Sequence, residues 1–248
     1  MIDGLDHIAI AAADVASAAG AYATLLGRVP DRRGFFQLGN MALKVAAAEE
    51  PGGDKSPPWR LAFAAGNLAE TRRRHERRGL PSAQPQGGLS NIDAAATHGV
   101  AMALVERAAD AAPHASFAKD SVHGLDHVVI RTTHPDRALG LYGARLGLDL
   151  RLDRTNAQWG SRLLFFACGE AVLEVAVDLA ADTLDQPDRV TGLAWRVADP
   201  VAAQARLAAA GLDVSPVRPG RKLGTQVFTV RSGVVGAPAL MIGGEGAR

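Results

Sequence analysis

The chain has 248 residues, of which 48% are hydrophobic and 21% charged, and its formal net charge is +1. This length suits one large domain or two domains of about 120 residues, and the composition can bury ordinary globular cores. The near-neutral charge argues against nucleic acid or an acidic surface as the main partner. Cys168 is the single cysteine, which excludes an intrachain disulfide and a zinc site built from cysteines.

The start of the chain does not read as a secretory signal. Asp3, Asp6 and Asp14 come before any Lys or Arg. The longest apolar stretch nearby, residues 15–27, has 13 residues, which is too short to cross a bilayer. We therefore expect a soluble, cytoplasmic protein without a membrane partner.

The first third of the chain contains a segment that returns later almost unchanged in pattern. Gly4 begins "GLDHIAIAAADVASAAGAYATLLG", and Gly124, 120 residues later, begins "GLDHVVIRTTHPDRALGLYGARLG". In the first copy "LDHIAIAA" predicts a strand, Asp14 is a suitable helix N-cap, and Gly27 is a suitable helix end. A repeat of this period predicts two similar halves.

The repeat continues beyond this first helix. "GFFQLGNMALKVAAA" and "LFFACGEAVLEVAVD" each predict two short strands, with Phe35 and Phe165 130 residues apart. "WRLAFAAGNLAETRRRHERRGL" and "TGLAWRVADPVAAQARLAAAGL" each predict a strand, a helix and a glycine stop, with Phe63 and Trp195 132 residues apart. Short strands close each half. The sequence thus predicts four βαβββ units in an α+β fold.

Two units per half predict two tandem domains, residues 1–107 and 124–248. The Ala-rich stretch 108–123, which contains Pro113, is the expected linker. An eight-stranded half made of two units would curl its sheet into an incomplete barrel around a central cleft. Clefts between packed units are where small ligands usually bind.

These motifs resemble the vicinal oxygen chelate superfamily. The resemblance rests on "LDHIAI" and "LDHVVI" with the following "Y…LG" helix, on the "LEV" strand, and on the later "LAF" and "LAW" strands that enter a helix. The superfamily includes glyoxalase I, bleomycin-resistance proteins, extradiol dioxygenases and methylmalonyl-CoA epimerase, and the second half is most similar to glyoxalase-like domains. The resemblance implies the fold more firmly than the reaction, because one fold hosts many chemistries.

In metal-using members, the resemblance implies up to four ligand positions per cleft, two on first strands and two on last strands. In the second half these positions hold His127, Glu174, Gly192 and Leu240, and in the first half they hold His7, Lys44, Arg60 and Ala103. No pairing of units collects more than one histidine and one carboxylate, so a triad of two histidines and a carboxylate is absent. This disfavours extradiol dioxygenase activity. Asp178, Gln226 and His123 are further side chains near the second-half positions by sequence.

We therefore expect the first half to be structural and the second to hold the ligand cleft. Two functions stay open. The first is a protein that binds or sequesters a small ligand, as bleomycin-resistance members do without metal. The second is a glyoxalase-type lyase or isomerase with Glu174 as base or metal ligand and His127 beside it. The expected cofactor is none, or a weakly held divalent metal ion on His127 and Glu174. The oligomeric state stays open, with a homodimer among the alternatives.

The remaining candidates are ligand-binding side chains of the second half: Arg162, Trp159, Trp195, Arg196, Arg221, Lys222 and Gln226. The sequence "VRPGRKLGTQVF" places Arg218, Arg221 and Lys222 around two glycines, which suits an anion clamp or a solvated hairpin. The aromatic residues suit a wall for a flat ligand, with Phe165 expected in the core. An arginine such as Arg162 or Arg196 is the expected partner of Glu174 if that carboxylate is structural.

Overall fold

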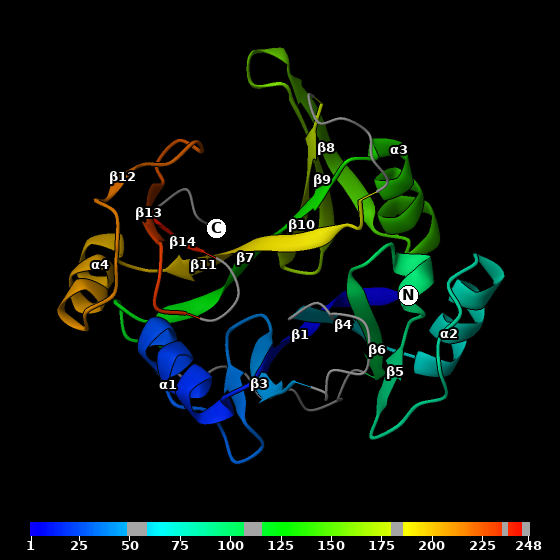
Figure 1. The fold of residues 1–248 in the computed structure, drawn as a ribbon, viewed down its shortest axis with the longest axis horizontal. Helices are drawn as coiled ribbons and strands as arrows, with labels where there is room; N and C mark the ends of the chain where they lie inside the picture. Colours follow the sequence, from blue (N-terminus) through cyan, green and yellow to red (C-terminus); the bar gives the residue numbers. More distant parts are fainter. Residues whose placement is uncertain (49–58, 107–115, 180–185, 235–237, 245–248) are drawn as a thin grey trace.

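A computed structural model of the protein describes residues 1–48, 59–106, 116–179, 186–234 and 238–244. Its first half contains β1 (Ile2–Ala12), α1 (Val15–Leu26), β2 (Phe35–Gln37), β3 (Ala42–Ala47), β4 (Trp59–Ala65), α2 (Leu68–Arg77), β5 (Leu89–Asn91), the 3₁₀ turn η1 (Ala94–Thr97) and β6 (Ala101–Glu106). The helices lie on the outer sides of two curved sheets, one from each half (Figure 1). The predicted α+β class is confirmed.

The second half repeats the order of elements of the first half and adds further strands. It contains β7 (Val122–Thr132), α3 (Pro135–Ala138) running into the π-helical η2 (Leu139–Arg145), β8 (Asp149–Asn156), the turn η3 (Ala157–Trp159), β9 (Ser161–Cys168), β10 (Ala171–Asp178), β11 (Arg189–Val197), α4 (Pro200–Ala209), β12 (Arg218–Pro219), β13 (Gln226–Val230) and β14 (Ala239–Gly243).

The strand orders show that units pair within each half. The second-half order is β12-β13-β14-β11-β7-β10-β9-β8, and the first-half order is β2-β3-β1-β4-β6-β5. The first-half strands thus match the inner six of the second half. The expectation of eight strands in each half is wrong for the described part of the first half. The repeat offset rises from 120 to 130 residues after the first helix, and the additional residues of the second copy form β8 and η3. This explains why the second-half sheet has an additional strand, β8, at one edge.

The repeated helices form where their caps predict. The side chain of Asp14 accepts a hydrogen bond from the amide of Ser17, and Gly27 ends α1 with a left-handed φ of 69°. Tyr22 in α1 and Tyr142 in η2 are both buried, so each helix covers its own sheet with the same aromatic residue. None of the helices in the described ranges is long and apolar enough to cross a membrane.

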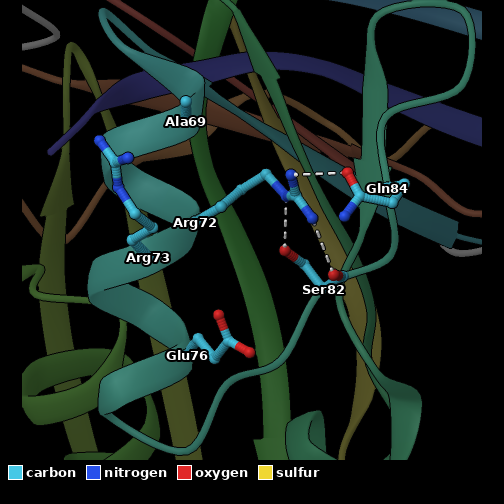
Figure 2. A pocket seen from close by; sticks show the side chains of 6 residues that line it. All are labelled: Ala69, Arg72, Arg73, Glu76, Ser82 and Gln84. Atoms are coloured by element: carbon cyan, nitrogen blue, oxygen red, sulfur yellow. Dashed lines mark hydrogen bonds between the residues drawn. The ribbon is translucent and has the colours of Figure 1, made fainter.

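The basic segment 72–78 forms the C-terminal half of α2 and its C-cap, Arg78. Arg74 and Arg77 lie in the last turn, where cations favour the helix dipole. A groove of about 260 Å³ lies beside this helix. Figure 2 shows that Arg72, which lines it, donates to the side chains of Ser82 and Gln84. Each nitrogen of the Arg72 guanidinium thus already donates a hydrogen bond to Ser82 or Gln84.

Reciprocal hairpin contacts join the two halves. The β2–β3 turn of the first half meets the start of β7, where the Asn40 amide donates to the carbonyl of Leu125 at 2.7 Å and accepts from its amide at 2.9 Å. The β9–β10 turn meets β1 in the corresponding way, with Gly169 against Gly4 so closely that a Cβ on Gly4 would lie 3.3 Å from the Gly169 Cα. Each half thus holds the first strand of the other.

Candidate functional site

The repeated "LDH" segment forms a β-bulge. Neighbouring residues of a regular strand point to opposite faces of the sheet, but in β7 the register against β11 shifts between Leu125 and His127. Asp126 is the additional residue, and its carboxylate lies beside the next side chain, 2.8 Å from Nδ1 of His127. The same shift in β1 places Asp6 2.7 Å from Nδ1 of His7. The repeat therefore encodes a paired aspartate and histidine.

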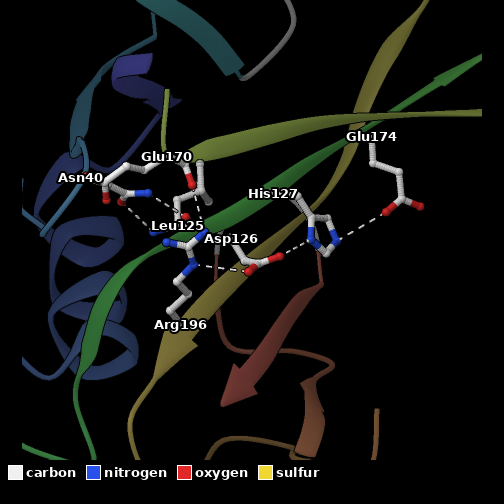
Figure 3. A network of polar contacts seen from close by, with 7 residues as sticks. All are labelled: Asn40, Leu125, Asp126, His127, Glu170, Glu174 and Arg196. Carbon is white, nitrogen blue, oxygen red and sulfur yellow. Dashed lines mark hydrogen bonds and ion pairs between the residues drawn. The ribbon is translucent and has the colours of Figure 1, made fainter. Parts of the chain in front are cut away.

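The other side of the His127 ring faces a second carboxylate. Nε2 of His127 lies 3.6 Å from Oε2 of Glu174, and both side chains are 18% exposed. That separation allows an ion pair but exceeds a normal hydrogen bond, so neither group saturates the other. Figure 3 shows the chain of contacts that runs from Arg196 through Asp126 and His127 to Glu174.

Arg196 and His127 keep Asp126 ionised. Burial alone would raise the pKa of Asp126, but the hydrogen bonds and charges of His127 and Arg196 outweigh it, so this pKa is lowered. Nε of Arg196 donates to Asp126 at 3.1 Å, and its Nη2 donates to the main-chain carbonyl of Glu170 at 2.8 Å. Because an ionised carboxylate only accepts, Nδ1 of His127 is the donor. In a neutral imidazole, Nε2 then carries the lone pair toward Glu174.

His127 and Glu174 lie on the sheet face that the helices leave uncovered. In β10 the residues alternate between buried and half-buried, and Glu174 belongs to the half-buried set. Its direct neighbours across the ladders are Phe165 on β9 and Val129 on β7. Phe165 is half-buried on this helix-free face, whereas the next residue, Phe166, is fully buried. The expectation that Phe165 packs in the core is therefore wrong, and it offers an apolar surface beside Glu174.

The residues present do not fit a catalytic metal site. Catalytic metal centres normally hold the ion with three protein ligands. Gly192 and Leu240, at the other two family positions, supply no ligand atom, which leaves His127 and Glu174 alone. Within the described ranges, no three His, Cys, Asp or Glu side chains form a group that could hold a metal ion.

The other predicted site residues are scattered. Arg162 pairs with Asp153 of β8 at 2.6 Å, on the sheet face opposite to Glu174. Trp195 is 0% exposed in the core, so it is not available to line the helix-free face. Gln226 is exposed and opposite Gly243, away from that face. Two further candidates, Arg221 and Lys222, lie in the exposed segment between β12 and β13.

Three more predictions concern residues near the site. The side chain of Trp159 lies outside the described part of the structure. Asp178 is at the end of β10, four residues along the strand from Glu174. His123 lies where the halves meet, near Arg196 and away from Glu174. Arg196 itself pairs with Asp126 rather than with Glu174, so the partner of Glu174 is His127.

The first-half counterpart is built differently. His7 is buried, and its ring meets the edge of Phe35 with centroids 5.3 Å apart. Lys44 takes the position of Glu174, and its ammonium lies 4.9 Å from the Phe35 ring centroid. Arg60 faces Ala9 from the other side of β1. Cations thus occupy two positions at which a metal ion would need ligands.

One interpretation of the histidines from sequence is that each sits on a first strand with a ring nitrogen hydrogen-bonded to the backbone or to a neighbouring aspartate, and the contacts of His7 with Asp6 and of His127 with Asp126 agree with it. Sequence reasoning missed the role of Asn40, and regular strand alternation alone would place Asp126 on the opposite face from His127. Only the bulge brings it to His127. Asn40 acts across the junction between the halves, and no local pattern in the sequence marks that contact.

Comparisons with known proteins agree with this architecture. Residues 124–236 match the family model described as Glyoxalase/Bleomycin resistance protein/Dioxygenase superfamily. A mutant of 4-hydroxymandelate synthase from Streptomyces coelicolor is similar in structure, with a TM-score of 0.74 and 15% identity over 100% of this chain and 94% of that one. The 2,2',3-trihydroxybiphenyl 1,2-dioxygenase from Sphingomonas wittichii has a TM-score of 0.66 and 15% identity over 98% and 91%. A search of curated proteins finds no match.

At these identities the similar structures establish the fold over the full length, and the family model identifies the second half. The second half thus matches the Glyoxalase/Bleomycin resistance protein/Dioxygenase superfamily model over residues 124–236, and the chain as a whole has the two-domain fold seen in 4-hydroxymandelate synthase.

Proposed function

We propose that the protein binds a small, mainly apolar molecule on the helix-free face of its second half. The observation that carries this proposal is the 3.6 Å separation of His127 Nε2 from Glu174 Oε2. One hydroxyl or amine of a ligand can lie within hydrogen-bond distance of both atoms, and both accept when His127 is neutral. Phe165 and Val129 supply the adjoining apolar surface.

The donor set favours binding over metal chemistry. One similar structure is by name a 2,2',3-trihydroxybiphenyl 1,2-dioxygenase. In this chain, however, two of the four family ligand positions hold Gly192 and Leu240, whose side chains offer no ligand atom. Asp126 and Arg196 hold His127 in one orientation without any ion. A ring fixed in this way is ready to accept a hydrogen bond from a ligand, because its ordering is already complete before binding.

The test uses matched probes with and without a hydrogen-bond donor. Benzyl alcohol and benzylamine should bind in NMR titrations, and toluene should bind more weakly. Glu174→Met should weaken the two donor probes about tenfold or more, because hydrogen bonds to charged groups contribute about 1.5–3 kcal/mol. Lys44→Met, at the equivalent first-half position, is the control and should change nothing. Probe shifts confined to the half that contains Lys44 would contradict the proposal.

Proton transfer is the second candidate function. It is favoured by the carboxylate of Glu174, which is half-buried and beside an imidazole whose Nε2 can take up or release a proton. Glu174 would remove a proton from the carbon next to a carbonyl, which leaves an enolate, and Glu174 would return a proton to that same carbon, so the step exchanges the proton or inverts the carbon. The check is deuterium exchange at the α-carbon of phenylacetone in D₂O. Exchange above the rate with Glu174→Gln supports an enzyme, and equal rates leave binding alone.

A further inference from the structure

A cavity of about 390 Å³ lies where the two halves meet. Its lining comes from the β2–β3 turn, the segment before β7, the β9–β10 turn and the end of β11, and includes Asn40, Phe117, His123, Glu170 and Arg196. Neither His127 nor Glu174 lines it, so the cavity is separate from the site proposed above. Its volume is within the range of small-ligand pockets, about 300–1,000 Å³.

Two opposite charges face this cavity without neutralising each other. Arg196 is held by Asp126 and by the main-chain carbonyl of Glu170, as Figure 3 shows. The Glu170 side chain is exposed, and the structure shows no ion pair between it and any residue of the described ranges. Glu170 corresponds in the repeat to Asn40, whose amide is fully used on Leu125. The carboxylate has replaced that amide and is left available.

The remaining wall is aromatic. The rings of Phe117 and His123 lie 6.3 Å apart at 60°, and the Arg28 guanidinium is 4.4 Å from the Phe117 ring centroid. Burial lowers the pKa of His123, and the positive charges of Arg196 and Arg28 lower it further. His123 is therefore neutral near pH 7, and the potential around it is positive. A carboxylate is the ligand group that this end of the cavity favours.

We propose that this junction cavity binds a small zwitterion with a flat apolar body, the chemistry of an aromatic amino acid. The ligand carboxylate pairs with Arg196, its ammonium pairs with Glu170, and its ring lies against Phe117 and His123. A ligand with both charges satisfies both side chains at once. A ligand with one charge leaves the other side chain without a partner.

The experiment compares three probes that share a phenyl body, by isothermal titration calorimetry on the full chain. L-Phenylalanine carries both charges, 3-phenylpropionate only the carboxylate, and phenethylamine only the ammonium. We expect L-phenylalanine to bind at least tenfold more tightly than either of the others. Inorganic phosphate, which lacks the apolar body, should not compete.

Two charge variants assign the ligand groups. Arg196→Gln should weaken L-phenylalanine and 3-phenylpropionate at least tenfold. Glu170→Gln should remove the advantage of L-phenylalanine over 3-phenylpropionate, because only the ammonium contact is lost. Arg231→Gln is the matched control, since Arg231 is an exposed arginine of the same half that pairs with Asp213. It should leave all three affinities unchanged.

A third variant guards against loss of folding, because Arg196 also supports Asp126. Ala198 is exposed at the cavity wall, and Ala198→Trp should fill the space and abolish binding without removing a polar contact. Glu174→Gln should keep the preference for L-phenylalanine over 3-phenylpropionate, because that preference arises at Glu170, and this separates the cavity from the other site. Equal affinity for all three probes, or full binding by Ala198→Trp, would overturn the proposal.

Discussion

His7 and His127 have the same bulge and the same aspartate but different neighbours at the far ring nitrogen. His127 faces the carboxylate of Glu174, whereas the position equivalent to Glu174 in the first half holds Lys44. A carboxylate beside an imidazole leaves a pair of acceptors for a ligand. A lysine over an aromatic ring leaves a cation that would repel a metal ion. The exchange of Glu174 for Lys44 is therefore the difference between the copies that lies beside the paired aspartate and histidine.

Gly192 offers a direct test of why the metal site is incomplete. A Cβ added there would have its nearest heavy atoms at 3.8 Å, so a larger residue meets only ordinary contacts at that point. We expect Gly192→His to give a third ligand beside His127 and Glu174 and to raise Zn²⁺ affinity at least tenfold. Calorimetric titration with Zn²⁺ measures this. Gly192→His combined with Glu174→Gln should return to the affinity of the unmodified chain, and no gain in the single variant would contradict this account.

At the scale of single residues, the sequence predicts His127 and Glu174 as a pair but not what surrounds them. Their proximity follows from parallel pairing of β7 with β10, which the repeat indicates. Trp195 was expected on the ligand side because it is aromatic and lies on a strand. Side-chain direction depends on register, and a one-residue shift reverses it. The bulge at Asp126 is such a shift, and composition does not reveal it.

Among the elements, α1 and α4 are joined by one arginine. The last carbonyls of a helix lack partners inside the helix. Arg206 of α4 donates to the carbonyl of Thr24 at 2.6 Å and to that of Leu25 at 3.1 Å, and it also reaches the carbonyl of Asp120. The second half thus caps a helix of the first half.

Arg206→Met should lower the free energy of unfolding by about 2–3 kcal/mol, because it keeps the aliphatic stem and removes hydrogen bonds from a charged donor. Urea unfolding followed by circular dichroism measures the change. Arg74→Met is the control, since the polar contact of Arg74 within the described residues is its pair with Glu70 in α2, and such pairs contribute about 0.3–0.5 kcal/mol. Equal costs for the two variants would show that the cap between the halves contributes no special stability.

At the scale of the whole molecule, the repeat offsets predict the strand order well. Phe35, Phe63 and Gly27 of the first copy all have structural counterparts in the second, at Phe165, Trp195 and Gly147. The contact between the halves is a different matter, because it depends on pairs such as Asn40 with Leu125 that are far apart in sequence. The sequence pattern predicts the elements within each half. It does not predict which surface of the first half contacts which surface of the second.

His75 lies in that contact and should make stability depend on pH. It is 1% exposed on α2, and burial lowers its pKa to about 4, despite a hydrogen bond to the main chain of Leu146 in the second half. An unfolded histidine has a pKa of about 6.5 and takes up its proton first. The unfolding free energy should therefore fall as the pH drops from about 6.5 to 4, by about 2–3 kcal/mol.

Urea unfolding at several pH values measures this slope, and His75→Phe should flatten it over the same window. Carboxylates with lowered pKa, such as Asp126, lose their contribution only at lower pH, so the two effects are separable. An unchanged slope in His75→Phe would assign the pH dependence to other groups.

The clamp of Asn40 on the Leu125 peptide has a consequence for the role of the first half. Leu125 is next to the bulged Asp126, so a side chain of the first half holds the backbone on which the second-half site is built. A first half without a ligand of its own would be dispensable if the two halves were independent. Here its deletion would release the strand that presents His127. The first half thus supports the second-half strand whether or not it binds a ligand itself.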